Sequence, residues 1–104
     1  MSRSMFYITC DSMEEAEKLA KQLVEERLVA CINVVPKIKS FFYWEGKAQS
    51  EEELLLLGKT RTDVVDQLVE RVKYLHSYDV PCVVSWEITE GNEEFLHWID
   101  SEVK

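Results

Sequence analysis

The sequence predicts an α+β fold of the ferredoxin-like, or split βαβ, class, in which helices cover one face of an antiparallel sheet. Short runs rich in β-forming residues alternate with two amphipathic helical patterns in the order strand, helix, two strands, helix, strand. A short helical pattern closes the chain, and one turn joins two of the strands into an extended hairpin. With 104 residues and 46% hydrophobic residues, we expect residues 1–104 to form a single domain around one core.

The N-terminal part predicts a buried strand followed by a helix. Residues 5–10 are short and rich in β-forming side chains. Asp11 and Ser12 are typical helix caps, and Glu14 and Glu15 stand at the spacing of a capping box. The apolar residues that follow recur at helical spacing, which indicates a helix with one face on the sheet. They are Met13, Ala16, Leu19, Ala20, Leu23 and Val24.

The middle of the chain predicts the extended hairpin. Residues 28–35 are β-like, and Pro36 interrupts them, which places this run at a sheet edge or at a bulge. The run resumes over 38–44 and turns at 45–47. The four leucines at 54–57 fit either helix or strand, and the turn before them favours strand. Four consecutive aromatics precede the turn, more apolar surface than two strands can hide, so we expect another surface to cover them.

The C-terminal part predicts a second helix, a strand and a terminal helix. Thr62 or Asp63 caps the second helix, and residues 80–88 form the last strand, in which apolar side chains alternate. Asn92 follows Gly91 and caps the short terminal helix. The apolar residues expected to pack from the two helices are Val64, Val65, Leu68, Val69, Val72 and Leu75 in the first, and Phe95, Leu96, Ile99 and Val103 in the second.

Composition limits the partners and the compartment. A net charge of −8 argues against nucleic acid, whose phosphates such a surface repels. The three cysteines are widely spaced and form no CxxC pair, so they predict neither a disulfide framework nor a closed zinc site. No hydrophobic segment has the length of a signal peptide core or of a membrane span. These features predict a cytoplasmic protein that does not bind membranes.

Five blocks of the sequence, taken in order, resemble the CutA divalent-cation tolerance family. They are RLVACIN at 27–33, FYWEGK at 42–47, LLGKTR at 56–61, LHSYDVP at 75–81 and the segment from EGN to tryptophan at 90–98. The resemblance implies a homotrimer of ferredoxin-like subunits whose sheets pack around a threefold axis. It also implies a role in tolerance of copper and other divalent cations. The architecture is similar to PII signalling proteins, which bind small effectors between subunits.

Cys10 and His76 are the predicted metal ligands, for copper(II) or another divalent cation. The resemblance implies a copper site made of a cysteine that ends the first strand and two adjacent histidines. Cys10 and His76 match that pattern, but Leu75 replaces the other histidine and Ser77 replaces a proline. From the residues themselves, the helix that follows Cys10 lowers its thiol pKa and favours a soft thiolate ligand. The alternatives are a buried apolar cysteine and a structural histidine that binds a backbone carbonyl.

A rival hypothesis is a PII-like trimeric sensor that binds a small anionic effector in a cleft between subunits. Lys59 and Arg61 precede a helix N-terminus and predict an anion site, which Lys47 of a neighbouring subunit could complete. The alternative is that these cations are solvated. The aromatic residues Tyr43, Trp44, Tyr78 and Trp86 fit either the lining of such a cleft or the packing of an interface.

An enzyme is the least favoured class. Tyr78, Asp79 and Glu90 could exchange protons, but no partnered nucleophile or oxyanion motif accompanies them. The sequence therefore predicts a non-enzymatic, trimeric protein that binds metal and contributes to divalent-cation tolerance.

Overall fold

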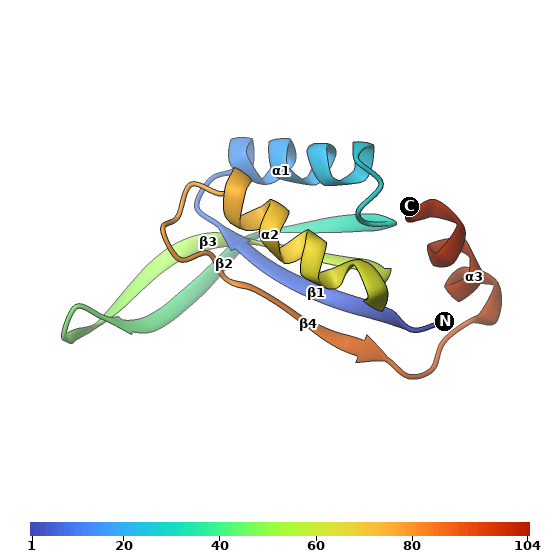
Figure 1. Cartoon of the computed structure of the whole chain (residues 1–104). Coiled ribbons are helices and arrows are strands. Elements are labelled where there is room, and N and C mark those ends of the chain that lie inside the picture. Colours follow the sequence, from blue (N-terminus) through green and yellow to red (C-terminus); the bar gives the residue numbers. More distant parts are fainter.

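The computed structural model describes residues 1–104 as one four-stranded antiparallel sheet with three helices. The strands stand in the order β2-β3-β1-β4, and α1 and α2 lie side by side over one face (Figure 1). This is the predicted split βαβ arrangement. The elements are β1 (Arg3–Cys10), α1 (Met13–Glu25), β2 (Cys31–Trp44), β3 (Lys47–Arg61), a 3-10 turn (Thr62–Val64), α2 (Val65–Leu75), β4 (Val83–Ile88) and α3 (Glu93–Glu102).

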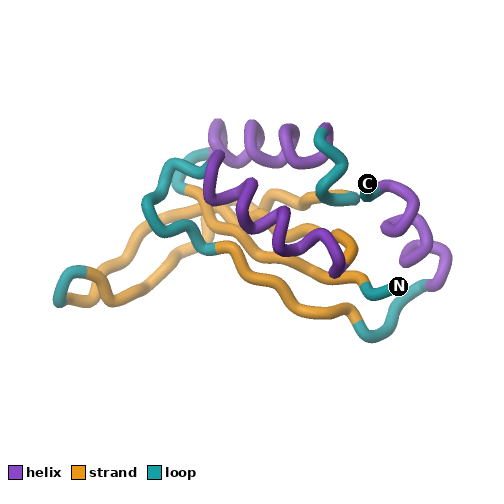
Figure 2. Tube along the Cα trace, viewed as in Figure 1, coloured by secondary structure: helices purple, strands orange, loops and turns teal.

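The β2–β3 hairpin extends well beyond the helical layer, and both termini lie at the opposite end of the molecule (Figure 2). Pro36 interrupts the ladder as predicted, because the register shifts between Val35 and Ile38. Lys37 takes a φ of 60° inside this bulge, and β2 is also an edge strand. The four leucines at 54–57 belong to β3, which confirms the strand interpretation.

The main core lies between the helices and the sheet. Alternate residues of β1, Phe6, Ile8 and Cys10, face the helices and are fully buried, because successive strand residues point to opposite faces. Leucines of β3 and the apolar stripes of α1 and α2 complete this cluster. A second, smaller cluster gathers under α3 and consists of Ala30, Val64, Leu96, Ile99 and Val103.

Two of the predicted helix starts are confirmed, and the third is wrong. The Ser12 hydroxyl accepts a hydrogen bond from the Glu15 amide, and Asn92 accepts one from the Glu94 amide. Neither Thr62 nor Asp63 caps α2, which begins after the 3-10 turn without any side-chain cap. The reason is tertiary: the Thr62 hydroxyl pairs with that of Ser4, 2.7 Å away on β1.

Two predicted strands are shorter than expected at their N-terminal ends. Residues 28–30 form a buried connection instead of the start of β2, and Arg27 enters it with a φ of 61°. The Thr60 hydroxyl donates to the Leu28 carbonyl oxygen at 2.7 Å and holds this connection against β3. Residues 80–82 lie outside β4, because Pro81 has no N–H to contribute to the ladder.

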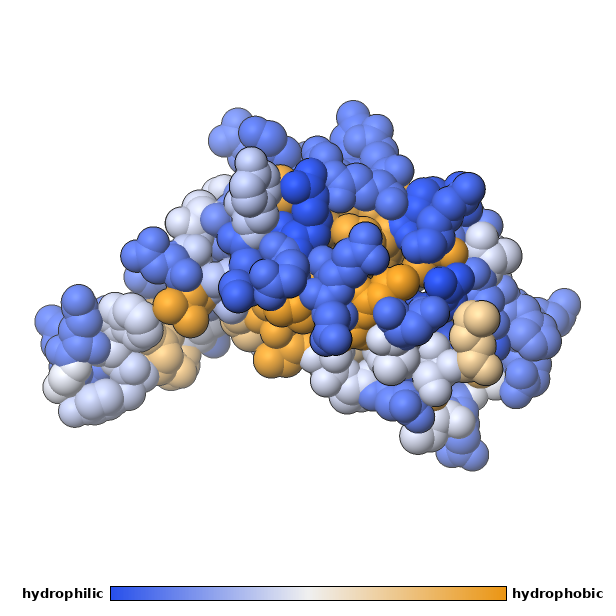
Figure 3. Space-filling view, in the orientation of Figure 1, coloured by the Kyte–Doolittle hydropathy of each residue, from blue (hydrophilic) through white to orange (hydrophobic).

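The sheet face opposite α1 and α2 carries apolar side chains that no element of the chain covers. Val84 and Trp86 of β4 lie there, on the register positions opposite Tyr7 and Met5 of β1. The hairpin adds the exposed ring of Trp44 to this face, while the exposed ring of Phe41 lies on the other face of the hairpin. On the face drawn in Figure 3, hydrophilic side chains cover much of the helical layer, while apolar atoms show near the base of the hairpin. No helix has the length and apolar character needed to cross a membrane.

Candidate functional site

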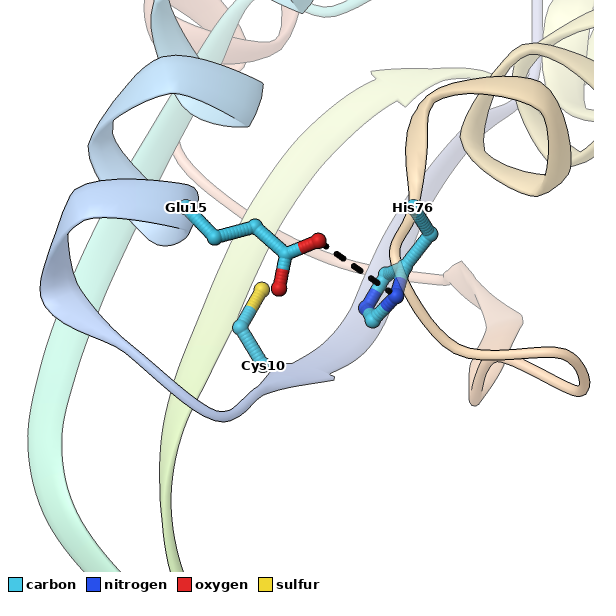
Figure 4. Close-up of side chains that lie close together, drawn as sticks. All are labelled: Cys10, Glu15 and His76. Carbon is cyan, nitrogen blue, oxygen red and sulfur yellow. Dashed lines mark ion pairs between the residues drawn. The ribbon is translucent and has the colours of Figure 1, made fainter.

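Three elements bring together Cys10, Glu15 and His76, and their potential ligand atoms all lie within 4.8 Å of one another. Cys10 ends β1, Glu15 lies in the first turn of α1, and His76 follows the last turn of α2 (Figure 4). The short connection from β1 to α1 keeps the first two residues adjacent. Because α2 packs beside α1 on the same face of the sheet, its C-terminal end brings the imidazole to them.

The imidazole of His76 is fully buried and hydrogen-bonded at both nitrogens. Nε2 lies 2.7 Å from the Thr9 carbonyl oxygen, and the Tyr78 backbone N–H donates to Nδ1 at 3.1 Å. A carbonyl oxygen only accepts and an amide N–H only donates, so Nε2 donates to Thr9 and Nδ1 accepts from Tyr78 in this arrangement. Nδ1 also lies 3.7 Å from a Glu15 carboxylate oxygen.

Glu15 is a member of this cluster that the sequence analysis assigned only to helix capping. Its carboxylate accepts hydrogen bonds from the Ser77 amide at 2.7 Å and from the Ser77 hydroxyl at 2.9 Å. A proline at position 77 has neither donor, so the serine found here orients this carboxylate. The sequence did contain a signal that Glu15 lies near Cys10. When a helix directly follows a strand, its first turn lies beside the end of that strand.

The environment of Cys10 contradicts the predicted thiolate. Burial, together with the negative charges of Glu15, Asp11 and Glu53, raises the pKa of its thiol from 9.0 to about 12. These effects outweigh any influence of the α1 N-terminus, so the free thiol is protonated at neutral pH. The same carboxylates attract a cation, and metal binding would therefore release the thiol proton.

The donor set fits a divalent transition-metal ion. Thiolate sulfur and imidazole nitrogen suit copper and zinc, and a carboxylate oxygen completes a three-ligand set that leaves one position open. Two changes must accompany binding: Cys10 must lose its proton, and Nδ1 of His76 must give up the Tyr78 amide. Leu75 supplies no ligand and packs against the main core instead.

The predicted anion-binding cations do not come together within one chain. Lys47 and Arg61 lie at opposite ends of β3. The Arg61 guanidinium already donates to the Asp63 carboxylate and to the carbonyl oxygens of Asp100 in α3 and of Val103 just after it. The ammonium of Lys59 lies 3.9 Å from the Cys31 sulfur and 5.8 Å from the centre of the Phe95 ring.

The four aromatic residues predicted to line a cleft or an interface also lie in different parts of the chain. Trp44 and Tyr78 line one groove on the hairpin side of the molecule, whereas Trp86 lines a different hollow beside α3. The Tyr43 ring is exposed, and its hydroxyl donates to the Gly46 carbonyl oxygen at 2.9 Å. Within a single chain these rings therefore do not form one effector site.

Comparison with known proteins gives one consistent family. The model of the CutA1 divalent ion tolerance protein family matches residues 4–102. The divalent-cation tolerance protein CutA of Archaeoglobus fulgidus is 46% identical over 101 residues, which cover 97% of this chain and 98% of that protein. The Thermus thermophilus protein of the same name is 51% identical over 92 residues, which cover 88% and 89% of the two chains.

Solved structures agree with this result. The crystal structure of CutA1 from Oryza sativa superposes with a TM-score of 0.97 at 39% identity and covers 100% of this chain and 95% of that one. The structure of the periplasmic divalent cation tolerance protein CutA from Archaeoglobus fulgidus has a TM-score of 0.94 at 45% identity and covers 98% and 99%. The names of these proteins describe cation tolerance and state no enzymatic activity.

The same names overturn the predicted compartment. The Archaeoglobus structure is described as periplasmic, and the similar protein of Arabidopsis thaliana, 43% identical over 98 residues, is named as chloroplastic. The chain covers 94% of its own length in that match but 54% of the plant protein. The prediction of a cytoplasmic protein was wrong, because free cysteines and overall composition do not specify a compartment.

Proposed function

The chain belongs to the CutA1 divalent ion tolerance family, and on that premise we propose that Cys10, Glu15 and His76 bind a divalent transition-metal ion. Copper is the ion that we expect to bind most tightly, since it heads the affinity order for such ligands. The observation that carries the proposal is the convergence of three different donor side chains within 4.8 Å. The protein would act by binding metal and not by catalysis.

The electrostatics of the cluster support this function. Three carboxylates, those of Glu15, Asp11 and Glu53, act on the Cys10 thiol and disfavour its ionisation. A bound divalent cation reverses that effect, because its charge stabilises the thiolate and is itself stabilised by the carboxylates. Binding should therefore weaken steeply as the pH falls, since protons compete with the metal for Cys10.

We also propose that the working form is a homotrimer. The support is the uncovered sheet face together with the exposed aromatics of the hairpin, of which Phe41 is 76% exposed and Trp44 is 53% exposed. A chain of this size rarely leaves so many large apolar side chains open to water. Nothing in the arrangement favours the anion-binding alternative, because the donors of Arg61 are already occupied.

The test of the metal site is copper affinity by chelator competition. We expect Cys10→Ala, His76→Ala and Glu15→Gln each to weaken binding about tenfold or more, which corresponds to about 1.4 kcal/mol. Cys82→Ala and His97→Ala are matched controls, since they remove a cysteine and a histidine that lie outside the cluster. If the controls lose as much affinity as the cluster variants, copper binds adventitiously and the proposal fails.

The test of the trimer is light scattering at micromolar protein. We expect a mass of about three subunits, and Trp44→Ala should lower both the mass and the melting temperature if its ring is buried between subunits. A monomeric mass for the unmodified chain would refute the trimer and leave the metal site unaffected.

A further inference from the structure

We propose that Ser77 is the positioning residue that makes Glu15 a metal ligand and so gives the cluster a preference for divalent ions over copper(I). The inference rests on the proposed function and adds the residue that sets its metal selectivity. Ser77 follows His76 in the loop after α2, and its backbone N–H and its hydroxyl both donate to the Glu15 carboxylate, at 2.7 and 2.9 Å. This pair of hydrogen bonds, here called the Ser77 clamp, joins the loop to the first turn of α1.

The other two donors of the cluster are placed by the core. The Cys10 side chain is fully buried at the end of β1. The His76 ring is held by the Thr9 carbonyl oxygen and by the Tyr78 amide. Neither side chain forms a hydrogen bond with Ser77, so we expect both to keep their positions when Ser77 is replaced.

Glu15 is the donor that lies nearest to solvent. Its side chain is 18% exposed, and together with Ser77 it lines a hollow of about 480 Å³ between α1 and the end of α2. Lys18 lines the same hollow. Without the clamp, the carboxylate would gain rotamers that point to water or toward the Lys18 ammonium group. The clamp removes that freedom before binding, and residues that orient a metal ligand in this way raise metal affinity.

The carboxylate also affects which metal ions the cluster prefers. Cys10 and His76 offer sulfur and nitrogen, a soft pair that suits copper(I), whereas a carboxylate oxygen is a hard donor that suits divalent ions. The second positive charge of a divalent ion also gains more from a nearby negative charge. Because Ser77 acts through Glu15, its loss should weaken the binding of divalent ions and leave copper(I) binding nearly unchanged.

A proline at position 77 is the sharpest perturbation of the clamp. Ser77 donates to no group other than the Glu15 carboxylate, so proline removes both donors of the clamp and no other hydrogen bond. His76 has a φ of −76° and a ψ of 147°, which is the extended conformation that a residue before proline prefers. Ser77→Ala removes the hydroxyl alone, and Ser77→Thr keeps both donors.

The experiment titrates the metal-free full chain with cobalt(II), followed by visible absorption, and with copper(I), kept reduced by ascorbate and measured by chelator competition. We expect Ser77→Pro to weaken cobalt(II) binding about tenfold and copper(I) binding less than about twofold. Ser77→Ala should weaken cobalt(II) binding about fivefold through one lost hydrogen bond, and Ser77→Thr should restore it. Ser101→Ala, which removes an exposed serine hydroxyl on α3, is the matched control and should change neither affinity.

A double mutant separates positioning from a merely structural role. If Ser77 acts through Glu15, then Ser77→Ala in a Glu15→Ala background should change cobalt(II) affinity less than about twofold. The same fivefold loss in that background, or equal losses for cobalt(II) and copper(I), would overturn the proposal. Unchanged cobalt(II) affinity in both Ser77→Pro and Ser77→Ala would overturn it too. In each case the proposed function still stands if Cys10→Ala and His76→Ala weaken cobalt(II) binding, so the two failures are distinguishable.

Discussion

Replacing Gly58 with alanine should destabilise the protein strongly, because two neighbours already occupy the space of a side chain. Gly58 lies on β3 between Phe6 of β1 and Ile32 of β2. An added Cβ would clash with Cζ of Phe6 and would lie 2.6 Å from the Cys31 carbonyl oxygen. The Phe6 ring is fully buried in the core, and the carbonyl belongs to β2, so neither can move aside cheaply.

The size of the effect follows from these two contacts. Overpacking of a core costs about 1–3 kcal/mol, and a clash with both a buried ring and a backbone oxygen belongs at the upper end of that range. Replacing glycine also restricts the unfolded chain, which offsets about 0.4–1 kcal/mol. A net loss of about 2 kcal/mol should lower the melting temperature by roughly 10 °C for a chain of this size.

Urea unfolding followed by circular dichroism, at a fixed protein concentration, measures this loss. Gly91→Ala is a control, since its nearest neighbour, a Leu96 methyl carbon, would lie at an ordinary 3.5 Å. Gly46→Ala has open space but a φ of +81°, so it should cost about 1 kcal/mol through backbone strain alone. Adding Phe6→Leu to Gly58→Ala should recover only part of the loss, because the carbonyl contact remains. Equal unfolding midpoints for Gly58→Ala and Gly91→Ala would refute the reasoning.

Three further predictions concern single interactions. The pKa of the Cys10 thiol is raised from 9.0 to about 12, so its contribution to the free energy of unfolding is full below pH 9.0 and is lost as the pH rises toward 12. In urea titrations at different pH values, Cys10→Ser should remove this part of the loss of stability at alkaline pH. An unchanged pH profile would contradict the assignment. Hydrogen bonds from Arg3 lower the pKa of Asp100 below 3.8, so stability is lost as the pH falls through that lowered value, and Asp100→Asn should flatten the acid limb of the same profile. Tyr78→Phe removes the hydroxyl that donates to Glu53 and should lower the free energy of unfolding by about 1.5–3 kcal/mol; a loss below about 0.5 kcal/mol would mean that water replaces the hydroxyl.

Local patterns in the sequence were enough to predict the order of the elements and most of their limits. The predictions that Ser12 and Asn92 cap helices are confirmed, because a cap depends only on residues two or three positions away. The prediction that Pro36 interrupts the strand ladder is also confirmed, because proline lacks a backbone N–H donor in any context. The alternation and helical spacing of apolar residues likewise act within a few positions, and they predicted the split βαβ fold.

The candidate site depended on contacts that no local pattern contains. Glu15 has the spacing of a capping-box residue, yet its carboxylate binds Ser77 and lies beside His76, more than 60 positions along the chain. The pKa of the Cys10 thiol also depends on tertiary contacts. Its position before a helix predicts a lowered pKa, and its burial among carboxylates raises it instead.

The sequence by itself thus determined which residues form strands and helices, because periodicity, capping and backbone restriction act over short distances. Only the tertiary structure decided which side chains share a site and in which protonation state. Desolvation and Coulomb interactions depend on neighbours that folding brings together from β1, α1 and α2. The cluster of Cys10, Glu15 and His76 is a product of that packing.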